Sequence, residues 1–287
     1  MRGFLFDMIR IGDFNELKTV RSTSVGVFLE DQEGTEILLP NKYVPNGIKL
    51  GDLLKVFCYL DHEERPIATT LHPKIIRDGF AFLFVAQINR IGAFMDWGLE
   101  KQLLAPYSEQ LKPMNEGQGY LVHCYLDKDT FRLVATSKVE KYLKKEGHSF
   151  QKNDEVSLLA YRKTNIGWEV IINQAFKGLL FFNDIFREIR SGDRLKGYIK
   201  NVREDGKIDV SLQPSGVVAL ESSALRIVDF LKENGGKTTL NDKSTPEEIK
   251  EQLQMSKKAF KKGVGILYKQ RKISLSEQGI QLTDKTF

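Results

Sequence analysis

Residues 90–138 decide the fold. They contain the runs R-I-G-A-F-M-D-W-G-L-E-K-Q-L-L-A-P (90–106), G-Q-G-Y-L-V-H-C-Y-L-D (117–127) and F-R-L-V-A-T-S-K (131–138). Short β-type runs alternate here with glycine, aspartate and proline, a pattern that is typical of the strands and turns of a small β-barrel.

The same pattern occurs three times in the chain. Each copy opens with a glycine: Gly26, Gly92 and Gly167. A second glycine follows 25 positions later in each copy: Gly51, Gly117 and Gly192. A closing run of small residues then begins 17 or 18 positions further on, at Ala68, Ala135 and Val210. Because the register holds in all three copies, we interpret them as an internal repeat.

Each copy has room for about five locally connected strands, which predicts an OB-type five-stranded Greek-key barrel. We therefore predict a mainly β, multidomain chain. Three tandem barrels are expected at residues 1–72, 73–146 and 147–213, and the second should carry a short helical tail over residues 139–147.

After residue 213 the sequence pattern changes from strands to helices, and residues 214–287 are predicted to form an α+β winged-helix domain. Helices are expected at 221–233, 245–254 and 257–270, followed by a hairpin at 273–282. Thr245, Pro246 and Glu248 form the capping box and proline start of the middle helix. The order helix, helix-turn-helix, hairpin is that of a winged helix.

Charge is distributed unevenly along the 287 residues, whose net charge is +5. Residues 214–287 hold 13 Lys/Arg and 9 Asp/Glu, whereas the first 213 residues hold 30 and 29. This local excess predicts a polyanionic partner near the C-terminal end. The apolar N-terminal run is too short for a signal peptide and no run reaches transmembrane length, so we expect a cytoplasmic protein and no membrane partner.

Catalytic and metal-binding patterns are absent from the sequence. Cys58 and Cys124 occupy equivalent positions in two copies, so we expect them in separate cores without a disulfide. The four histidines have no metal-ligand spacing, and there is no P-loop, dinucleotide fingerprint or nucleophile elbow. We predict no enzymatic activity, no cofactor and no small-molecule substrate.

The second copy resembles the S1 RNA-binding domain, through G-A-F-M-D-W-G-L-E-K-Q-L-L (92–104), V-x-C-Y-L-D (122–127) and R-L-V-A-T-S-K (132–138). The first copy keeps G-V-F and the L-L-P run. The third copy replaces G-A-F with G-W-E (167–169).

The whole chain resembles the conserved virulence factor B family of bacterial RNA-binding proteins. Further local resemblances are I-G-D-F-N-E-L (11–17), I-L-L-P-N-K-Y-V-P (37–45), D-K-S-T-P-E-E-I (242–249) and M-S-K-K-A-F-K-K (255–262). This resemblance implies RNA binding, a regulatory role in gene expression and no catalysis.

Aromatic residues are the first candidates for RNA contact, because OB-type barrels stack bases on exposed rings. Phe28 and Phe94 lie two residues after their opening glycines. By the resemblance to S1 domains, the outward face of this strand is the usual binding surface. Each could instead be a barrel-core residue, and the same two interpretations stay open for Trp97. A second set lies six residues after the second glycine: Phe57, His123 and Tyr198. Strand alternation predicts that this set points outward, although packing between domains is the preferred interpretation for Phe57.

Basic residues are the second group of candidates. Three residues before each closing strand stand Arg65, Arg132 and Lys207, where S1 domains tend to carry a cation near the nucleic acid. The third copy adds Arg194, Lys196 and Lys200, together with Arg187, Arg190 and Arg203. Since it lacks the ring at Glu169, we expect the third barrel to bind more by charge than by stacking.

The most basic stretch is the last predicted helix and the residues after it. Its cations are Lys257, Lys258, Lys261, Lys262, Lys269, Arg271 and Lys272. Lysines four residues apart repel each other on one helix face, which a bound phosphate backbone would relieve; the alternative is an ordinary solvated face. Gly263 and Gly265 cost roughly 1 kcal/mol each in a helix. Close packing against a neighbouring helix would explain them, as would a shorter helix.

Two hypotheses follow. The chain is an RNA-binding protein that holds single-stranded RNA on its barrels and winged helix and so changes the fate of a message. Alternatively, it is a scaffold that docks on a ribosome, a polymerase or an RNA-degradation complex. A third hypothesis, that the winged helix binds duplex DNA, is weaker because lysines favour backbone contact over base recognition.

Overall fold

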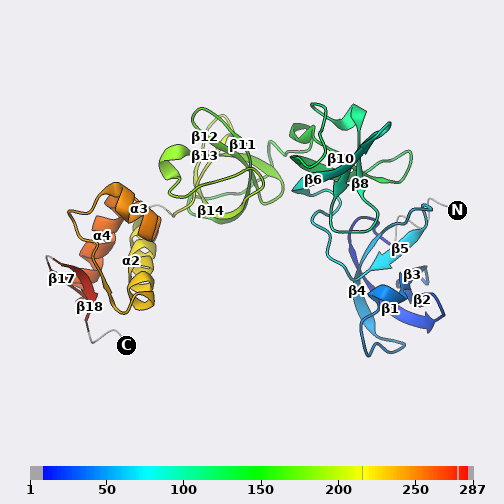
Figure 1. The fold of residues 1–287 in the computed structure, drawn as a ribbon, viewed down its shortest axis with the longest axis horizontal. Helices are drawn as coiled ribbons and strands as arrows, with labels where there is room; N and C mark the ends of the chain where they lie inside the picture. Colours follow the sequence, from blue (N-terminus) through cyan, green and yellow to red (C-terminus); the bar gives the residue numbers. More distant parts are fainter. Residues whose placement is uncertain (1–8, 215, 277, 284–287) are drawn as a thin grey trace. The chain divides into compact units, whose positions relative to one another are not determined.

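The computed structural model describes residues 9–214, 216–276 and 278–283 and contains three closed five-stranded barrels followed by a winged-helix domain (Figure 1). This confirms the predicted mainly β, multidomain class. The chain forms two compact units, residues 1–143 and 144–287. The predicted domain boundaries at residues 72, 146 and 213 fall in loops between elements and stay predictions.

Barrel 1 follows the predicted OB order, with strands arranged β1-β2-β3-β5-β4 and closed between β4 and β1. Its elements are β1 (Phe14–Ser22), β2 (Gly26–Glu30), β3 (Glu36–Pro40), the 3₁₀ turn η1 (Asn41–Tyr43), β4 (Leu53–Leu60) and β5 (Pro66–Thr69). Alternate residues fill the interior, among them Leu29, Leu39 and Val56, which are fully buried.

Barrel 2 repeats this topology in the same compact unit. Its elements are β6 (Phe80–Asn89), β7 (Gly92–Asp96), β8 (Leu103–Pro106), η2 (Tyr107–Glu109), β9 (Gly119–Leu126), β10 (Leu133–Thr136) and η3 (Val139–Lys141). Phe57 and Tyr59 of barrel 1 pack into its core against Trp97, with ring centroids 5.7 and 6.3 Å away. Packing between barrels is thus confirmed for Phe57, and the expected helical tail is the single turn η3.

Barrel 3 opens the second compact unit. Its elements are β11 (Glu155–Lys163), β12 (Gly167–Ile172), β13 (Phe176–Phe181), η4 (Phe182–Asp184), β14 (Arg194–Val202) and β15 (Ile208–Ser211). Val170, Leu180 and Ile199 lie in its core.

The opening glycine of each copy is required by a close approach of two strands. A Cβ at Gly26 would lie 2.2 Å from the carbonyl oxygen of Leu39 on β3, and one at Gly92 would lie 2.4 Å from that of Ala105 on β8. Real Cβ atoms do not approach a backbone oxygen so closely. The opening glycine therefore recurs in the sequence because the close packing of β2 on β3, and of the equivalent strands in the other barrels, leaves no room for a side chain.

The winged-helix domain has the predicted order and one further strand. Its elements are α2 (Gly216–Glu233), β16 (Lys237–Thr238), α3 (Pro246–Leu253), α4 (Lys257–Lys269), β17 (Ile273–Ser276) and β18 (Gly279–Leu282). The predicted capping box is confirmed: the Glu248 N–H donates to the Thr245 hydroxyl at 3.2 Å, and the Thr245 N–H donates to Glu248 Oε2 at 2.8 Å. The strand β16, which pairs with β18, was not anticipated because it has only two residues.

Helix α4 continues through both of its glycines. A Cβ at Gly263 would lie 2.8 Å from Ile227 Cδ1 and 3.2 Å from the Ser223 carbonyl carbon on α2, so close helix packing explains this glycine. Gly265 has no heavy atom within 4 Å of such a Cβ, and packing does not explain it. The alternative of a shorter helix was wrong.

Cys58 and Cys124 are unpaired and buried in separate cores, as expected. Among the described residues, no helix is long and apolar enough to cross a membrane. Within the same part of the chain, no three His, Cys, Asp or Glu side chains gather as metal ligands.

Candidate nucleic-acid interface

Three cross-strand neighbours lie on the outward face of each barrel, and we call them the central row. They are Arg21, Phe28 and Leu38 in barrel 1; Gln87, Phe94 and Leu104 in barrel 2; and Arg162, Glu169 and Leu179 in barrel 3. The first residue of each row follows a β-bulge, which moves the side chain opposite the middle position. The equivalent position in the three barrels therefore carries side chains of different chemical character.

In barrel 1 a cation covers the ring of the central row. The guanidinium carbon of Arg21 lies 3.4 Å from the Phe28 ring centroid. Arg21 is held there by Glu36, with Nη2 and Oε2 2.7 Å apart, and this hydrogen bond raises the pKa of Arg21 and lowers that of Glu36. Residues 1–72 also hold 8 Lys/Arg against 11 Asp/Glu. This face of barrel 1 is therefore poorly suited to stacking a base of a polyanion.

In barrel 3 an ion-pair cluster replaces the ring. Glu169 accepts from Arg162, and its Oε1 lies 3.0 Å from Lys177 Nζ. Partial burial alone would raise the pKa of Glu169, but the hydrogen bonds from Arg162 and Lys177 outweigh it and the pKa lies below its ordinary value. The central row of barrel 3 offers charge but no aromatic surface.

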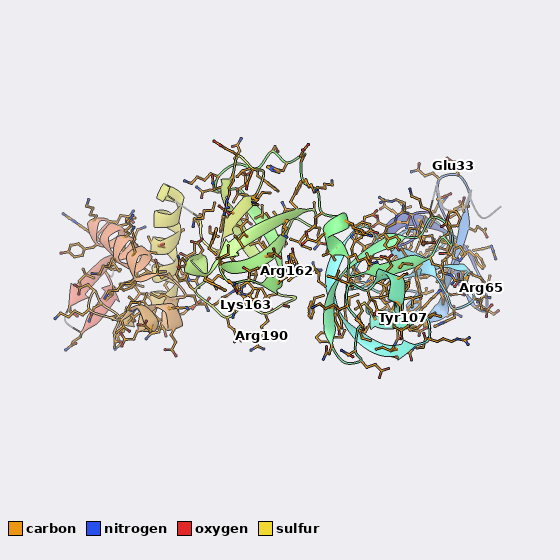
Figure 2. The ribbon with its side chains drawn as sticks, turned by 90° about the horizontal axis from the view of Figure 1, so that it is seen from above. Glu33, Arg65, Tyr107, Arg162, Lys163 and Arg190 are labelled. Carbon is orange, nitrogen blue, oxygen red and sulfur yellow. The ribbon has the colours of Figure 1, made fainter. Side chains whose placement is uncertain are left out.

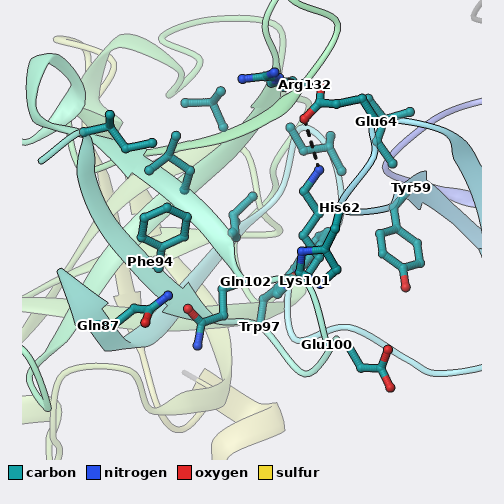
Figure 3. Close-up of a pocket in the computed structure, with 16 residues that line it drawn as sticks. Tyr59, His62, Glu64, Gln87, Phe94, Trp97, Glu100, Lys101, Gln102 and Arg132 are labelled. Carbon is teal, nitrogen blue, oxygen red and sulfur yellow. Dashed lines mark hydrogen bonds and ion pairs between the residues drawn. The ribbon is translucent and has the colours of Figure 1, made fainter. Parts of the chain in front are cut away.

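In barrel 2 the ring lies in a pocket of about 470 Å³ (Figure 3). Phe94 is half-buried, and its cross-strand neighbour Gln87 carries no charge. The carboxamides of Gln87 and Gln102 lie beside the ring in Figure 3. Gln102 Oε1 is buried and has no hydrogen-bond partner among the described residues. The pocket therefore combines an aromatic ring with an unused hydrogen-bond acceptor.

Two cations border this pocket and share one carboxylate. Arg132 Nε lies 2.5 Å from Glu64 Oε2, and Lys101 Nζ lies 3.5 Å from Glu64 Oε1 and donates to the Asp61 carbonyl at 2.7 Å. Burial would raise the pKa of Glu64, yet the hydrogen bond from Arg132 and the charges of Lys101 and Arg132 lower it. Glu64 thus holds both cations at the pocket edge (Figure 3).

Two predicted stacking residues are buried. Trp97 is 2% exposed, and its Nε1 donates to the Lys101 carbonyl at 2.5 Å, so the core interpretation holds and its ring has no face for a base. The prediction that His123 is accessible on the outward face was wrong, because it is 3% exposed. The residues around η3 cover this part of β9: His123 stacks on Tyr142, with centroids 4.0 Å apart.

The other predicted residues of the barrels are accessible. Tyr198 is half-buried, and Arg194 is exposed. The remaining cations are exposed but paired: Arg65 with Asp61 and Glu63, Lys196 with Glu155, Lys200 with Asp184 and Lys207 with Asp205. Exposed ion pairs contribute about 0–1 kcal/mol, so a phosphate could compete for these cations. Their role in RNA binding stays a prediction.

The basic residues of the winged helix differ from those of the barrels. Lys258, Lys261 and Lys262 are exposed on α4, away from the buried Phe260 and Leu267. Within the described part of the chain, none of these three lysines, nor the half-buried Lys257, forms an ion pair with a carboxylate. Arg271 and Lys272, just after α4, are also exposed. Among the described residues, the four lysines at positions 257, 258, 261 and 262 of α4 therefore carry positive charge that no neighbouring carboxylate pairs with.

Comparison with known proteins places the chain in a family. Residues 11–71 match the family model of the S1 domain, and residues 225–282 match that of the CvfB-like winged helix domain. Uncharacterized protein YitL of Bacillus subtilis is 30% identical over 275 residues, covering 93% of this chain and 92% of that protein. Conserved virulence factor B of Staphylococcus epidermidis is 28% identical over 285 residues, covering 96% and 95%. The chain belongs to the conserved virulence factor B family.

A solved structure is also similar to this member of the conserved virulence factor B family. It is a multidomain protein with nucleic acid binding domains from Streptococcus pneumoniae, 25% identical, with 95% of this chain and 98% of that chain covered and a TM-score of 0.40. The two matched family models describe nucleic-acid-binding domain types and not catalytic ones.

The sequence analysis did not identify Gln87, Lys101 and Gln102, which line the barrel 2 pocket, as candidate binding residues. A signal for Gln87 was present. It lies five residues before the opening glycine, as Arg21 and Arg162 do in their copies. Lys101 and Gln102 lie in an irregular segment between β7 and β8, where no periodicity indicates direction.

Proposed function

We propose that this chain is a non-catalytic, cytoplasmic RNA-binding protein that holds single-stranded RNA and thereby regulates gene expression after transcription. Two surfaces carry the binding: the pocket around Phe94 in barrel 2 and the lysines of α4. The S1-domain match and the winged-helix match support a nucleic-acid ligand.

The observation that carries this proposal is the Phe94 pocket. A base stacked on an accessible aromatic ring contributes about 1–3 kcal/mol by alanine substitution. Gln102 Oε1 lacks a partner among the described residues, and the base edge would supply an N–H donor to it. An unmet buried acceptor is costly, so binding that satisfies it is favoured.

The shape of the pocket supports a single-stranded ligand. A space of about 470 Å³ admits one unstacked base but not a duplex. Lys101 and Arg132 at its edge would then meet the phosphates next to that base, in exchange for part of their contact with Glu64. Since every base has a π-face, this arrangement tolerates several sequences.

The α4 surface supports phosphate contact without base recognition. A lysine ammonium is a compact point charge, which binds phosphate but lacks the planar fork that reads a guanine edge. The lysines should therefore raise affinity for any nucleic-acid strand and make it depend strongly on salt.

Fluorescence anisotropy of the intact chain with labelled single-stranded RNA, single-stranded DNA and duplex DNA over a salt series tests the proposal. We expect the tightest binding for single-stranded RNA, with affinity that falls steeply as salt rises. An absence of binding to all three probes at low salt would overturn the proposal and favour the scaffold hypothesis.

A further inference from the structure

The edge of the Phe94 pocket contains a carboxylate from the neighbouring barrel. Glu64 belongs to the turn between β4 and β5 of barrel 1, yet it lines this pocket and contacts two cations of barrel 2. Its Oε2 lies 2.5 Å from Arg132 Nε, and its Oε1 lies 3.5 Å from Lys101 Nζ. The pocket of barrel 2 is therefore completed by a residue of barrel 1.

The equivalent cations of the other two barrels are paired differently. Arg65, at the surface of barrel 1 (Figure 2), pairs with two carboxylates of its own turn. Lys207 of barrel 3 pairs with Asp205, two residues earlier in the chain. Arg132 instead pairs with Glu64, which is 68 residues away in the sequence. The contact between Arg132 and Glu64 is therefore a feature of this pocket and not of the repeat.

The backbone of the turn holds Glu64 in a defined position. Its φ is +65°, a left-handed conformation that is uncommon for a residue other than glycine. The turn is fixed around it, because Asp61 Oδ1 accepts from the N–H groups of Glu63 and Arg65, both at 2.9 Å. Such a conformation persists only where the surrounding structure determines it, and it is frequent at ligand sites. The turn thus presents the Glu64 carboxylate to barrel 2.

The carboxylate of Glu64 keeps capacity for a further hydrogen bond. Two carboxylate oxygens offer about four acceptor positions and no donor when ionised. One oxygen of Glu64 accepts from Arg132 Nε, and the other meets the Lys101 ammonium at the longer distance of 3.5 Å. The Glu64 side chain is 30% exposed, so a ligand in the pocket can reach it. The complementary group on that ligand is a hydrogen-bond donor such as a hydroxyl.

The covalent order of a nucleotide places its ribose beside Glu64. The ribose joins the base to the neighbouring phosphates. With a base on Phe94 and a phosphate at Lys101 and Arg132, the ribose lies between them. Figure 3 shows Glu64 with both cations at one side of the pocket and Phe94 at another. The carboxylate then faces the sugar, whose 2′-hydroxyl is a donor that DNA lacks.

We propose that Glu64 recognises the ribose 2′-hydroxyl of the nucleotide in the Phe94 pocket and so determines the preference of this site for RNA over DNA. The inference rests on the proposed function, because it assumes a base on Phe94. A phosphate that takes over part of the contact with Lys101 and Arg132 frees an oxygen of Glu64, and the 2′-hydroxyl donates to that oxygen. Without this donor the carboxylate only repels the phosphate. Barrel 1 thus contributes selectivity, and barrel 2 contributes stacking and positive charge.

Trp97 fluorescence reports on this pocket separately from the other surfaces of the intact chain. Trp97 lines the pocket, and the second of the two tryptophans is Trp168 in barrel 3. A Trp168→Phe background therefore leaves one reporter. The probes are uridine tetranucleotides made as RNA, as 2′-fluoro RNA and as DNA. The 2′-fluoro probe keeps the sugar pucker of RNA but has no hydroxyl, so it separates the hydrogen bond from the sugar conformation.

We expect the unchanged pocket to bind the RNA probe about tenfold more tightly than the 2′-fluoro probe, because hydrogen bonds to charged groups are strong. Glu64→Ala should remove this preference. Glu64→Gln, which keeps an acceptor without the charge, should retain part of it and serves if the alanine variant does not fold. Glu63→Ala is the matched control, because Glu63 is the adjacent carboxylate and pairs with Arg65 instead. The control should keep the full preference for RNA.

An unchanged ratio of RNA to 2′-fluoro affinity in Glu64→Ala would overturn the inference. An equal loss for all three probes would also overturn it, since Glu64 would then only hold the cations. If Phe94→Leu weakens binding of the RNA probe in either case, the proposed function stands and only this inference fails. If no probe changes Trp97 fluorescence, the pocket holds no nucleotide and both fail.

Discussion

The guanidinium of Arg21 lies on the ring of Phe28, 3.4 Å from its centroid, and Glu36 holds it there. The equivalent pair in barrel 2 is Gln87 and Phe94, where the first residue carries no charge and the ring lines a pocket. Two rings that occupy the same place in the repeat thus differ in what covers them. This difference separates a structural aromatic residue from a candidate binding residue.

Arg21→Gln gives barrel 1 the residue that barrel 2 has. The change removes an exposed ion pair and a cation–π contact, so the free energy of unfolding should fall only slightly. Affinity for single-stranded RNA should stay the same or rise, because the variant uncovers a ring. Anisotropy titration checks this, and a clear loss of affinity would mean that Arg21 itself contacts RNA.

Changing Lys258, Lys261 and Lys262 together to glutamine should weaken RNA binding and flatten its salt dependence. Each phosphate contact adds about 0.7 to the slope of log affinity against log salt for a single strand, so the slope should fall by about 2. The matched control changes Lys18, Lys49 and Lys55, three exposed lysines of barrel 1, to glutamine. Equal slopes for the two triple variants would show that α4 is an ordinary solvated face.

Gly26→Ala should destabilise barrel 1 more than Gly34→Ala. Both glycines have positive φ, but a Cβ at Gly26 would lie 2.2 Å from the Leu39 oxygen, whereas one at Gly34 meets no atom within 4 Å. We expect a difference of about 1–3 kcal/mol in the free energy of unfolding. Urea unfolding followed by Trp97 fluorescence in a Trp168→Phe background measures it. Equal losses would mean that conformation alone, and not the strand approach, requires Gly26.

His123 should make stability depend on pH. Burial lowers the pKa of His123 to about 4, although the charge of Asp78 and a hydrogen bond to the Gly79 backbone act in the opposite direction. The unfolded chain binds the proton near pH 6.5, so stability is lost as pH falls from about 6.5 towards 4 and His123 adds no further loss below that. The loss should approach about 3 kcal/mol. Urea unfolding at pH 7, 5.5 and 4.5 should show a shallower pH dependence for His123→Phe, and an unchanged dependence would contradict this assignment.

The fold could be predicted because its turns, close strand contacts and helix caps require particular residue types at fixed spacing in the sequence. The opening glycines are needed where two strands approach closely, and Thr245 with Glu248 satisfies the first turn of α3. Both depend on residues that lie near each other in the chain. The two-residue strand β16 has no such local sequence pattern, because it is defined by its pairing with β18, which lies about forty residues later in the chain.

The candidate site could be predicted only in part. Phe94 was identified as a candidate from its position after Gly92. The pattern left Trp97 open between core and surface, and it placed His123 wrongly among the accessible residues. Alternation says which side of a strand a residue faces, not whether another element covers that side; the barrel 1–barrel 2 core covers Trp97 and the residues around η3 cover His123. The sequence pattern also does not show ion pairs, so Arg132 and Lys262 looked alike, although within the described residues only Arg132 lies beside a carboxylate.

The most direct test of the account compares Phe94→Ala with Phe28→Ala in the intact chain, by anisotropy with one labelled single-stranded RNA. We predict that Phe94→Ala lowers affinity by about 1–3 kcal/mol, because a stacked base loses its ring. Phe28→Ala should leave affinity nearly unchanged, because Arg21 already covers that ring. Equal effects of the two changes, or a loss confined to Phe28→Ala, would contradict the assignment of the binding site to barrel 2.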